Sequence, residues 1–145
     1  MKTTLPLIVV LLGFSVATVA SAADAKDEKK PPATRKEAKS FNNIDVAEFE
    51  KLRADKKNVV LDVRTAKEFA SGHIAGAVNI DWNGPDFEKQ VAALDKSKTY
   101  LVHCAVGGRS AKACALMNGK LKFTGCYNLE GGMTAWQKAG KPVEK

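Results

Sequence analysis

Residues 59–71 read VVLDVRTAKEFAS and predict a buried strand that passes directly into a helix. The run from Val59 to Val63 is short, apolar and rich in β-branched residues. It shows no strict alternation of polar and apolar side chains, which is typical of a strand covered on both faces of a parallel sheet. Thr65 and Glu68 then have the spacing of a capping box, which begins a helix. This strand–helix unit is the element from which the fold is predicted.

The same unit recurs along residues 41–145. Short apolar runs predict further strands at 77–80, 100–103 and, more weakly, 126–129. A second capping box at Asp45 and Glu48 begins an earlier helix. Apolar residues at helical spacing predict later helices around 87–94, 111–117 and 133–137. We therefore predict an α/β fold with a mainly parallel central sheet of about five strands and helices on both faces. Ligands of such folds bind at the carboxyl ends of the strands.

The residues with the most distinctive chemistry lie at 103–110, which read HCAVGGRS. An apolar strand ends in Cys104, small residues and glycines follow, and Arg109 and Ser110 open a helix. Adjacent glycines permit a tight curl of the backbone. Curled backbone at a helix N-terminus aims several N–H groups inward and forms a cradle for an anion. A cysteine at the base of such a cradle is expected to be largely thiolate, and we predict that Cys104 is a nucleophile.

The other loop residues are predicted to bind the substrate through this cradle. Arg109 either adds a positive charge at the rim or holds the loop in shape. Ser110 is expected to cap an unpaired amide or the thiolate. The remaining members of the predicted site supply backbone amides: Ala105, Val106, Gly107 and Gly108. An inert buried cysteine before a glycine turn is the alternative, and the Gly-Gly-Arg-Ser helix start argues against it.

The spacing of the loop separates two kinds of chemistry. Four residues lie between Cys104 and Arg109. Cysteine-dependent phosphatases use a loop one residue longer, which fits a tetrahedral phosphate. The shorter loop suits a single sulfur atom held as a persulfide, so the spacing favours sulfur transfer. A phosphatase or arsenate-reductase-like enzyme stays as an alternative, and so does a non-catalytic module that carries or binds sulfur.

Three motifs of the chain belong together. One is Cys104-x-x-Gly107-x-Arg109-Ser110. The second contains Leu61-Asp62-Val63-Arg64, Glu68-Phe69 and the run from Gly72 to Ile80; the third contains the run from Tyr127 to Gly132 and Ala135-Trp136. In these motifs and in their order along the chain, the sequence resembles the single-domain rhodaneses, which are thiosulfate sulfurtransferases. The resemblance implies double-displacement transfer through a Cys104 persulfide, with no metal and no organic cofactor. It also implies small sulfur-containing anions as donors, and cyanide, a thiol or a protein as the sulfur acceptor.

The resemblance also places Asp62 and Arg64 near the pocket. We include Arg64 among the substrate-binding residues and expect Asp62 to form a structural ion pair. His73 is expected to be a hydrogen-bonded residue of a turn. The side chain of His103 should point away from that of Cys104, because successive side chains of a strand alternate.

Further expectations concern the tryptophans and the other cysteines. Trp82 could line the pocket, whereas Trp136 is expected in the core. Cys114 and Cys126 are either two buried thiols or, in an oxidising compartment, a disulfide. In both cases Cys104 is left as the free thiol.

The segments before the domain have a different composition. Residues 1–22 are predicted to be a secretory signal peptide, with Lys2, an apolar run to Ala20 and a small-residue cleavage site. An uncleaved membrane anchor is the alternative, but the apolar run is shorter than a spanning helix needs. Residues 23–40 are predicted to be a charged, flexible linker. We expect an exported, periplasmic protein.

The charge of the whole chain is +7, of which the domain at 41–145 carries +4. In this domain no cluster of Arg and Lys alternates with aromatic residues, so nucleic-acid binding is not expected. We expect the protein to be a monomer that acts on small anions.

Overall fold

The computed structural model describes residues 41–145. The predicted signal peptide at 1–22 and the linker at 23–40 lie outside the described residues and stay predictions. The strands are β1 (Asn42–Ile44), β2 (Val59–Asp62), β3 (Val78–Asn79), β4 (Thr99–His103) and β5 (Gly125–Leu129). The helices are α1 (Val46–Arg53), α2 (Ala66–Ser71), α3 (Phe87–Ala92), α4 (Gly108–Gly119) and α5 (Gly132–Lys138).

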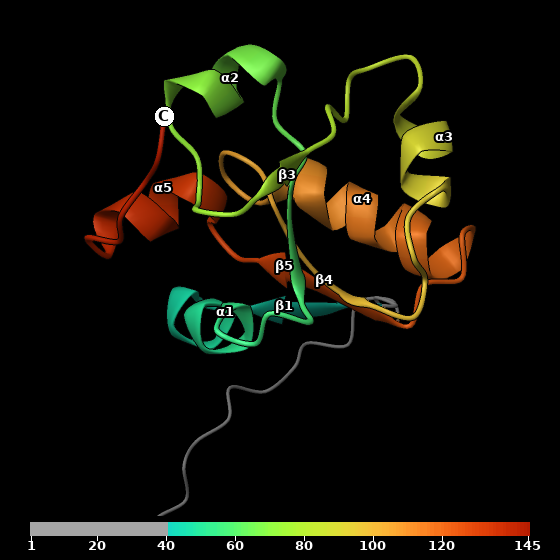
Figure 1. Cartoon of the computed structure of the whole chain (residues 1–145), viewed down its shortest axis with the longest axis horizontal. Helices are drawn as coiled ribbons and strands as arrows, with labels where there is room; N and C mark the ends of the chain where they lie inside the picture. Colours follow the sequence, from blue (N-terminus) through green and yellow to red (C-terminus); the bar gives the residue numbers. More distant parts are fainter. Residues whose placement is uncertain (1–40) are drawn as a thin grey trace, which may run out of the picture. The chain divides into compact units, whose positions relative to one another are not determined.

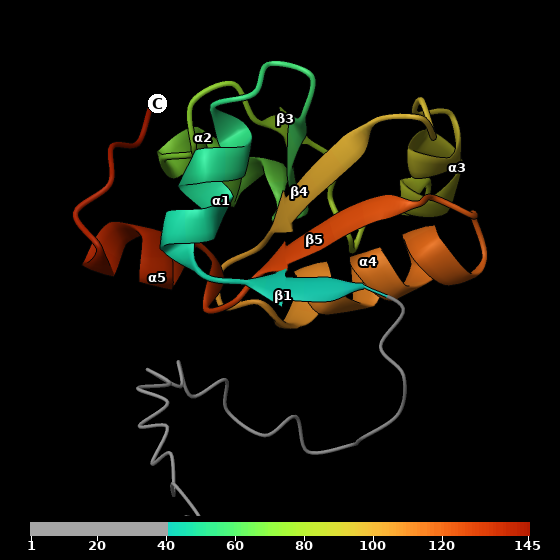
Figure 2. The same cartoon turned by 90° about the horizontal axis from the view of Figure 1, so that it is seen from below.

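The strands form one parallel sheet in the order β1-β5-β4-β2-β3 (Figures 1 and 2). Neighbouring residues of one strand belong to different cores, as expected when both faces are covered. Val60 packs in the core beneath α1 and α5, whereas Leu61 packs in the core beneath α3 and α4. Figure 1 shows these two pairs of helices on opposite sides of the sheet. The predicted α/β fold with a parallel, doubly covered sheet is therefore confirmed.

The predicted capping residues begin their helices. The carboxylate of Asp45 accepts a hydrogen bond from the Glu48 amide at 2.8 Å. Thr65 and Glu68 form a reciprocal capping box at the start of α2. These bonds satisfy amides that the first turn of a helix leaves without partners. Helix α2 therefore begins at Ala66, after a short connection from the end of β2 at Asp62.

Three local details differ from the expectation. The strand β1 carries no apolar run, and it is held by pairing with β5, including a 2.9 Å bond from Asn128 to Asn43. Helix α3 ends at Ala92, so Leu94 follows the helix and packs against the same core from a turn. The predicted strand at 77–80 has two residues in ladder pairing. The bounds of β1 and β3 are thus set by pairing with β5 and β2, whereas α3 ends in a local turn, where the Leu94 amide donates to Val91 O.

The strands end together where the loop of interest begins. Asp62 at the end of β2 is in register with His103 at the end of β4. Cys104 and Arg64 therefore leave the sheet at the same edge. Within residues 41–145, no helix is long and apolar enough to cross a membrane. The same residues contain no group of His, Cys, Asp and Glu side chains that could hold a metal ion.

Candidate active site

Cys104 lies between β4 and α4, at the base of a closed loop. Gly107 adopts a left-handed conformation (φ 97°) just before α4, which glycine reaches without strain. This turn brings the Gly107 amide to 3.1 Å from Cys104 Sγ, and Ser110 Oγ lies 3.4 Å from the same sulfur. The loop therefore surrounds one sulfur atom with hydrogen-bond donors.

These donors favour the thiolate form of Cys104. Burial raises the pKa of this thiol, but hydrogen bonds from the hydroxyl and amide of Ser110 and from the amides of Val106 and Gly107 outweigh it. The net result is a pKa below the ordinary thiol value. A lowered pKa on a cysteine that faces oriented amides is the state expected of a nucleophile.

The outer side of the loop is held by the start of α5. The Met133 amide donates to Cys104 O at 2.8 Å, and the Thr134 amide donates to Ala105 O at 3.0 Å. Gly132 permits this approach, since a Cβ built there would lie 2.8 Å from the Ala105 carbonyl carbon. Because these two loop carbonyls are bound on the outside, the amides that follow turn inward toward the sulfur.

Arg109 is held by a residue from a different part of the chain. Its guanidinium donates two hydrogen bonds to the Glu68 carboxylate, at 2.9 and 2.8 Å. Glu68 also accepts bonds from the amide and hydroxyl of Thr65. These contacts hold the pKa of Glu68 at about 2, chiefly through the Arg109 hydrogen bonds, with burial acting in the opposite direction. Of the two functions predicted for Arg109, the geometry supports holding the loop in shape.

Arg64 forms a separate buried cluster. Its guanidinium donates to both carboxylate oxygens of Asp62, at 2.6–3.0 Å, and to the Gly72 carbonyl at 2.8 Å. The residue is only 5% exposed. The ion pair expected for Asp62 is confirmed. The structure does not bring Arg64 to Cys104 Sγ, and its place in substrate binding stays a prediction.

The two histidines occupy structural positions. His73 Nδ1 lies 3.1 Å from Phe69 O in a turn, as predicted. His103 points into the core beneath α1, where its ring contacts the edge of Phe49. Burial is the main cause that lowers the pKa of His103 to about 4, so its imidazole is neutral at physiological pH.

Trp82 and Trp136 both pack against other aromatic rings. Trp136 is fully buried in the core beneath α1 and α5, as expected. Trp82 is half-buried and packs edge-on against Phe87. Its predicted contact with the pocket is not tested by the structure.

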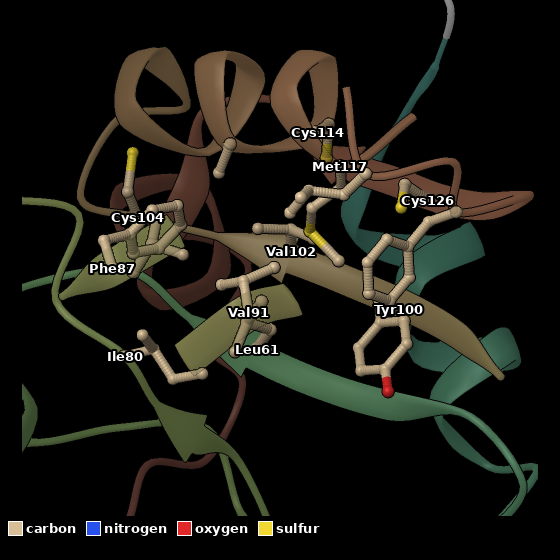
Figure 3. Close-up of a cluster of buried hydrophobic side chains, with 14 residues drawn as sticks. Leu61, Ile80, Phe87, Val91, Tyr100, Val102, Cys104, Cys114, Met117 and Cys126 are labelled. Carbon is tan, nitrogen blue, oxygen red and sulfur yellow. The ribbon is translucent and has the colours of Figure 1, made fainter. Parts of the chain in front are cut away.

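Cys114 and Cys126 lie in the core away from the loop. Both are free thiols, which agrees with the first of the two alternatives for this pair. Figure 3 shows their sulfurs at the opposite end of the core from the Cys104 sulfur. Burial raises the pKa of both thiols, to about 12 for Cys126. Cys104 is thus the one cysteine in the described chain with a lowered pKa.

Two features near the loop had no assigned function in the sequence. Glu68 was predicted to cap a helix and belongs to the second resemblance motif, but its contact with Arg109, 41 residues further along the chain, was not predicted. Gly131 and Gly132 belong to the third motif and had no predicted contact, although Gly132 lies against the carbonyls of the loop. Neither contact leaves a local pattern from which it could have been predicted.

Fold and site together define an α/β protein with an activated cysteine at the base of an anion-binding loop. The family model described as Rhodanese-like domain matches residues 45–139, and the chain belongs to this family.

Relatives include proteins named for sulfur transfer. Thiosulfate sulfurtransferase 16, chloroplastic, of Arabidopsis thaliana is 39% identical over 95 residues, which cover 58% of this chain and 78% of that protein. Thiosulfate sulfurtransferase GlpE of Pseudomonas putida is 35% identical over 104 residues, which cover 72% of this chain and 91% of that protein. The crystal structure of a rhodanese-related protein from Thermoplasma volcanium is 30% identical and has a TM-score of 0.61; the match covers 72% of this chain and 98% of that one. These relatives support sulfur transfer as the general activity.

Proposed function

We propose that this protein moves a sulfane sulfur from thiosulfate, or a related donor, to a thiophilic acceptor through a persulfide on Cys104. The observation that carries the proposal is the set of donors around one sulfur atom. The Gly107 amide and the Ser110 hydroxyl lie 3.1 and 3.4 Å from Cys104 Sγ. Such preorganised dipoles stabilise an anionic sulfur without rearrangement during the reaction.

The proposed reaction has two displacement steps. In the first, the Cys104 thiolate attacks the outer sulfur of thiosulfate; the sulfur–sulfur bond of the donor breaks, and sulfite leaves with the bonding electrons. In the second, cyanide or a thiol attacks the terminal sulfur of the persulfide, and the Cys104 thiolate is released. The amides of residues 105–110 hold the negative charge on sulfur in both states.

The cellular setting belongs to the same proposal. We propose that the apolar segment at 1–22 directs export to the periplasm. There the protein acts as a monomer on small anions, with a protein as a further sulfur acceptor.

Mass spectrometry of the full chain after incubation with thiosulfate tests the proposal. The chain should gain one sulfur atom, located on Cys104 by peptide mapping, and cyanide should remove it with formation of thiocyanate. Cys104→Ala should lose both steps. Cys126→Ala is the matched control, because it removes a buried thiol outside the loop and should keep both.

Two results would count against the proposal. A Cys104→Ala variant that still turns over thiosulfate excludes this cysteine as the carrier. Hydrolysis of an aryl phosphate without any sulfur loading would favour the phosphatase alternative instead.

A further inference from the structure

Every cationic side chain at the active loop is already matched by a carboxylate. Arg109 is the one charged residue from Cys104 to Ser110, and both of its terminal nitrogens bind Glu68. Arg64, at the same edge of the sheet, is buried against Asp62. No unpaired guanidinium therefore faces the sulfur from this part of the described chain.

Arg109 also interacts with a second anion, the Cys104 thiolate. Its pKa is raised first by the Glu68 hydrogen bonds and, to a smaller extent, by interaction with Cys104. With Cys104 as thiolate, these three groups sum to one negative charge before any donor arrives. The remaining stabilisation comes from dipoles, and the N-terminus of a helix such as α4 supplies the equivalent of only about half a positive charge.

The rim of the loop adds no compensating charge. Ala105, Val106 and Gly108 are neutral, and Val106 presents an apolar side chain to solvent. Glu130 flanks the loop on its other side, since its Cα would lie 4.0 Å from a Cβ built at Gly107. Lys67 and Lys112 are exposed on α2 and α4, outside residues 104–110.

This distribution disfavours a doubly charged donor. The side chains of the site already carry one net negative charge, and thiosulfate would add two more. An organic persulfide, R–S–SH, on a neutral or cationic carrier brings at most one, and its carbon chain suits an apolar rim. We propose that Cys104 takes its sulfur preferentially from a small organic persulfide whose carrier is not anionic, and that thiosulfate is the poorer donor.

This proposal rests on the persulfide mechanism proposed above. The sulfur transfer itself needs no reactant other than Cys104 and the donor. The Cys104 thiolate attacks the terminal sulfur of R–S–SH, and a new sulfur–sulfur bond forms. The bond between that sulfur and R–S breaks, and R–S⁻ leaves with the electron pair. Cys104 is left as Cys104–S–SH, so the sulfane sulfur has moved and no outside oxidant or reductant is consumed.

The experiment compares donors that differ in charge. Persulfides of cysteamine, cysteine and 3-mercaptopropionate have carriers that are cationic, neutral and anionic at neutral pH. Each of these, and thiosulfate, is given to the full chain at low salt. The rate of sulfur gain on Cys104 is divided by the rate of the same donor with a free small-molecule thiol. We expect this ratio to fall from the cationic to the anionic carrier and to be lowest for thiosulfate.

A charge placed on the rim tests the cause. Val106→Lys adds a cation at an exposed side chain and keeps the backbone amide that hydrogen-bonds Cys104. It should raise the thiosulfate rate relative to the neutral persulfide by roughly threefold at low salt. This gain should vanish in about 1 M salt, where the screening length is about 3 Å.

The matched control is Thr124→Lys, which adds the same charge at an exposed position before β5. The site lies beyond the other end of this five-residue strand, about 17 Å along the sheet. Because the Coulomb interaction in water falls with distance, this charge should change the ratio much less than Val106→Lys does.

The outcomes separate this proposal from the one on which it rests. If no donor adds sulfur to Cys104, the persulfide mechanism itself fails. A second outcome is that Cys104 gains sulfur from thiosulfate at the same normalised rate as from the neutral persulfide, or at rates that do not depend on the charge of the carrier. In that case the mechanism stands and the donor preference is wrong. An unchanged ratio in Val106→Lys would also overturn the electrostatic explanation.

Discussion

Cys104 and Cys126 belong to the same buried cluster, yet the pKa of Cys104 is lowered and that of Cys126 is raised relative to an ordinary cysteine. The pKa of Cys126 is raised to about 12 by burial. Cys104 has no exposed surface either, and burial also acts to raise its pKa. Hydrogen bonds from four donors around the loop reverse the outcome at Cys104.

The comparison shows that burial alone does not decide the reactivity of a cysteine. Cys126 lies within a strand, where the backbone amides are used by the ladder with β4 and β1. Cys104 lies where a strand ends and a helix begins, so several amides are free of ladder and helix partners. The glycines of the loop then turn these amides onto the sulfur. Activation is a property of the strand–helix junction.

The largest expected difference between the two cysteines is in their alkylation. The pKa of Cys104 lies below the ordinary thiol value and that of Cys126 is raised to about 12, so a far larger fraction of Cys104 is thiolate at neutral pH. Iodoacetamide at pH 7, followed by peptide mapping, should label Cys104 first. Labelling of Cys104 should rise with pH below the ordinary thiol range, and that of Cys126 only near pH 12. Equal rates for both cysteines would refute the comparison.

Substitution Gly132→Ala should remove the support of the loop. The new Cβ would collide with the backbone of Cys104 and Ala105, and alanine would be strained at φ 53°. We expect the free energy of unfolding to fall by about 3 kcal/mol, as measured by urea titration of tryptophan fluorescence. Gly119→Ala is the control, since no atom lies within 4 Å there; in a helix it should be neutral or stabilising. Equal stability of the two variants would show that contact with α5 does not hold the loop.

The smallest change concerns a single hydroxyl. Ser110→Ala removes the 3.4 Å contact with Cys104 Sγ but keeps the backbone amides. The pKa of Cys104 should rise by about one unit, and a titration of thiolate absorbance measures it. Ser97→Ala, which removes an exposed hydroxyl bound to Asp95, serves as the control. An unshifted titration in Ser110→Ala would assign the activation to the amides alone.

Much of the site could be predicted because its pattern is local. The residues from Cys104 to Ser110 are consecutive, and their order of strand end, glycines and helix start predicts the cradle. The same is true of the capping boxes at Asp45 and Thr65. The strand β1 was missed, because Asn42 and Asn43 are polar and are held by pairing with a strand far along the chain. The resemblance placed Arg64 near the pocket; the structure shows its guanidinium bound to Asp62, and its part in substrate binding stays a prediction.

The sequence by itself predicted the strands and helices other than β1, the parallel sheet and the cysteine whose pKa is lowered. These follow from hydrophobic periodicity, capping and turn residues, which act over a few neighbours. Only the tertiary structure decided the contact of Arg109 with Glu68, the seating of Gly132 on the loop and the pairing state of Cys114 and Cys126. Each of these joins residues that are separated in the chain, so it depends on how the elements pack. The charge that a donor meets at Cys104 is therefore set by packing.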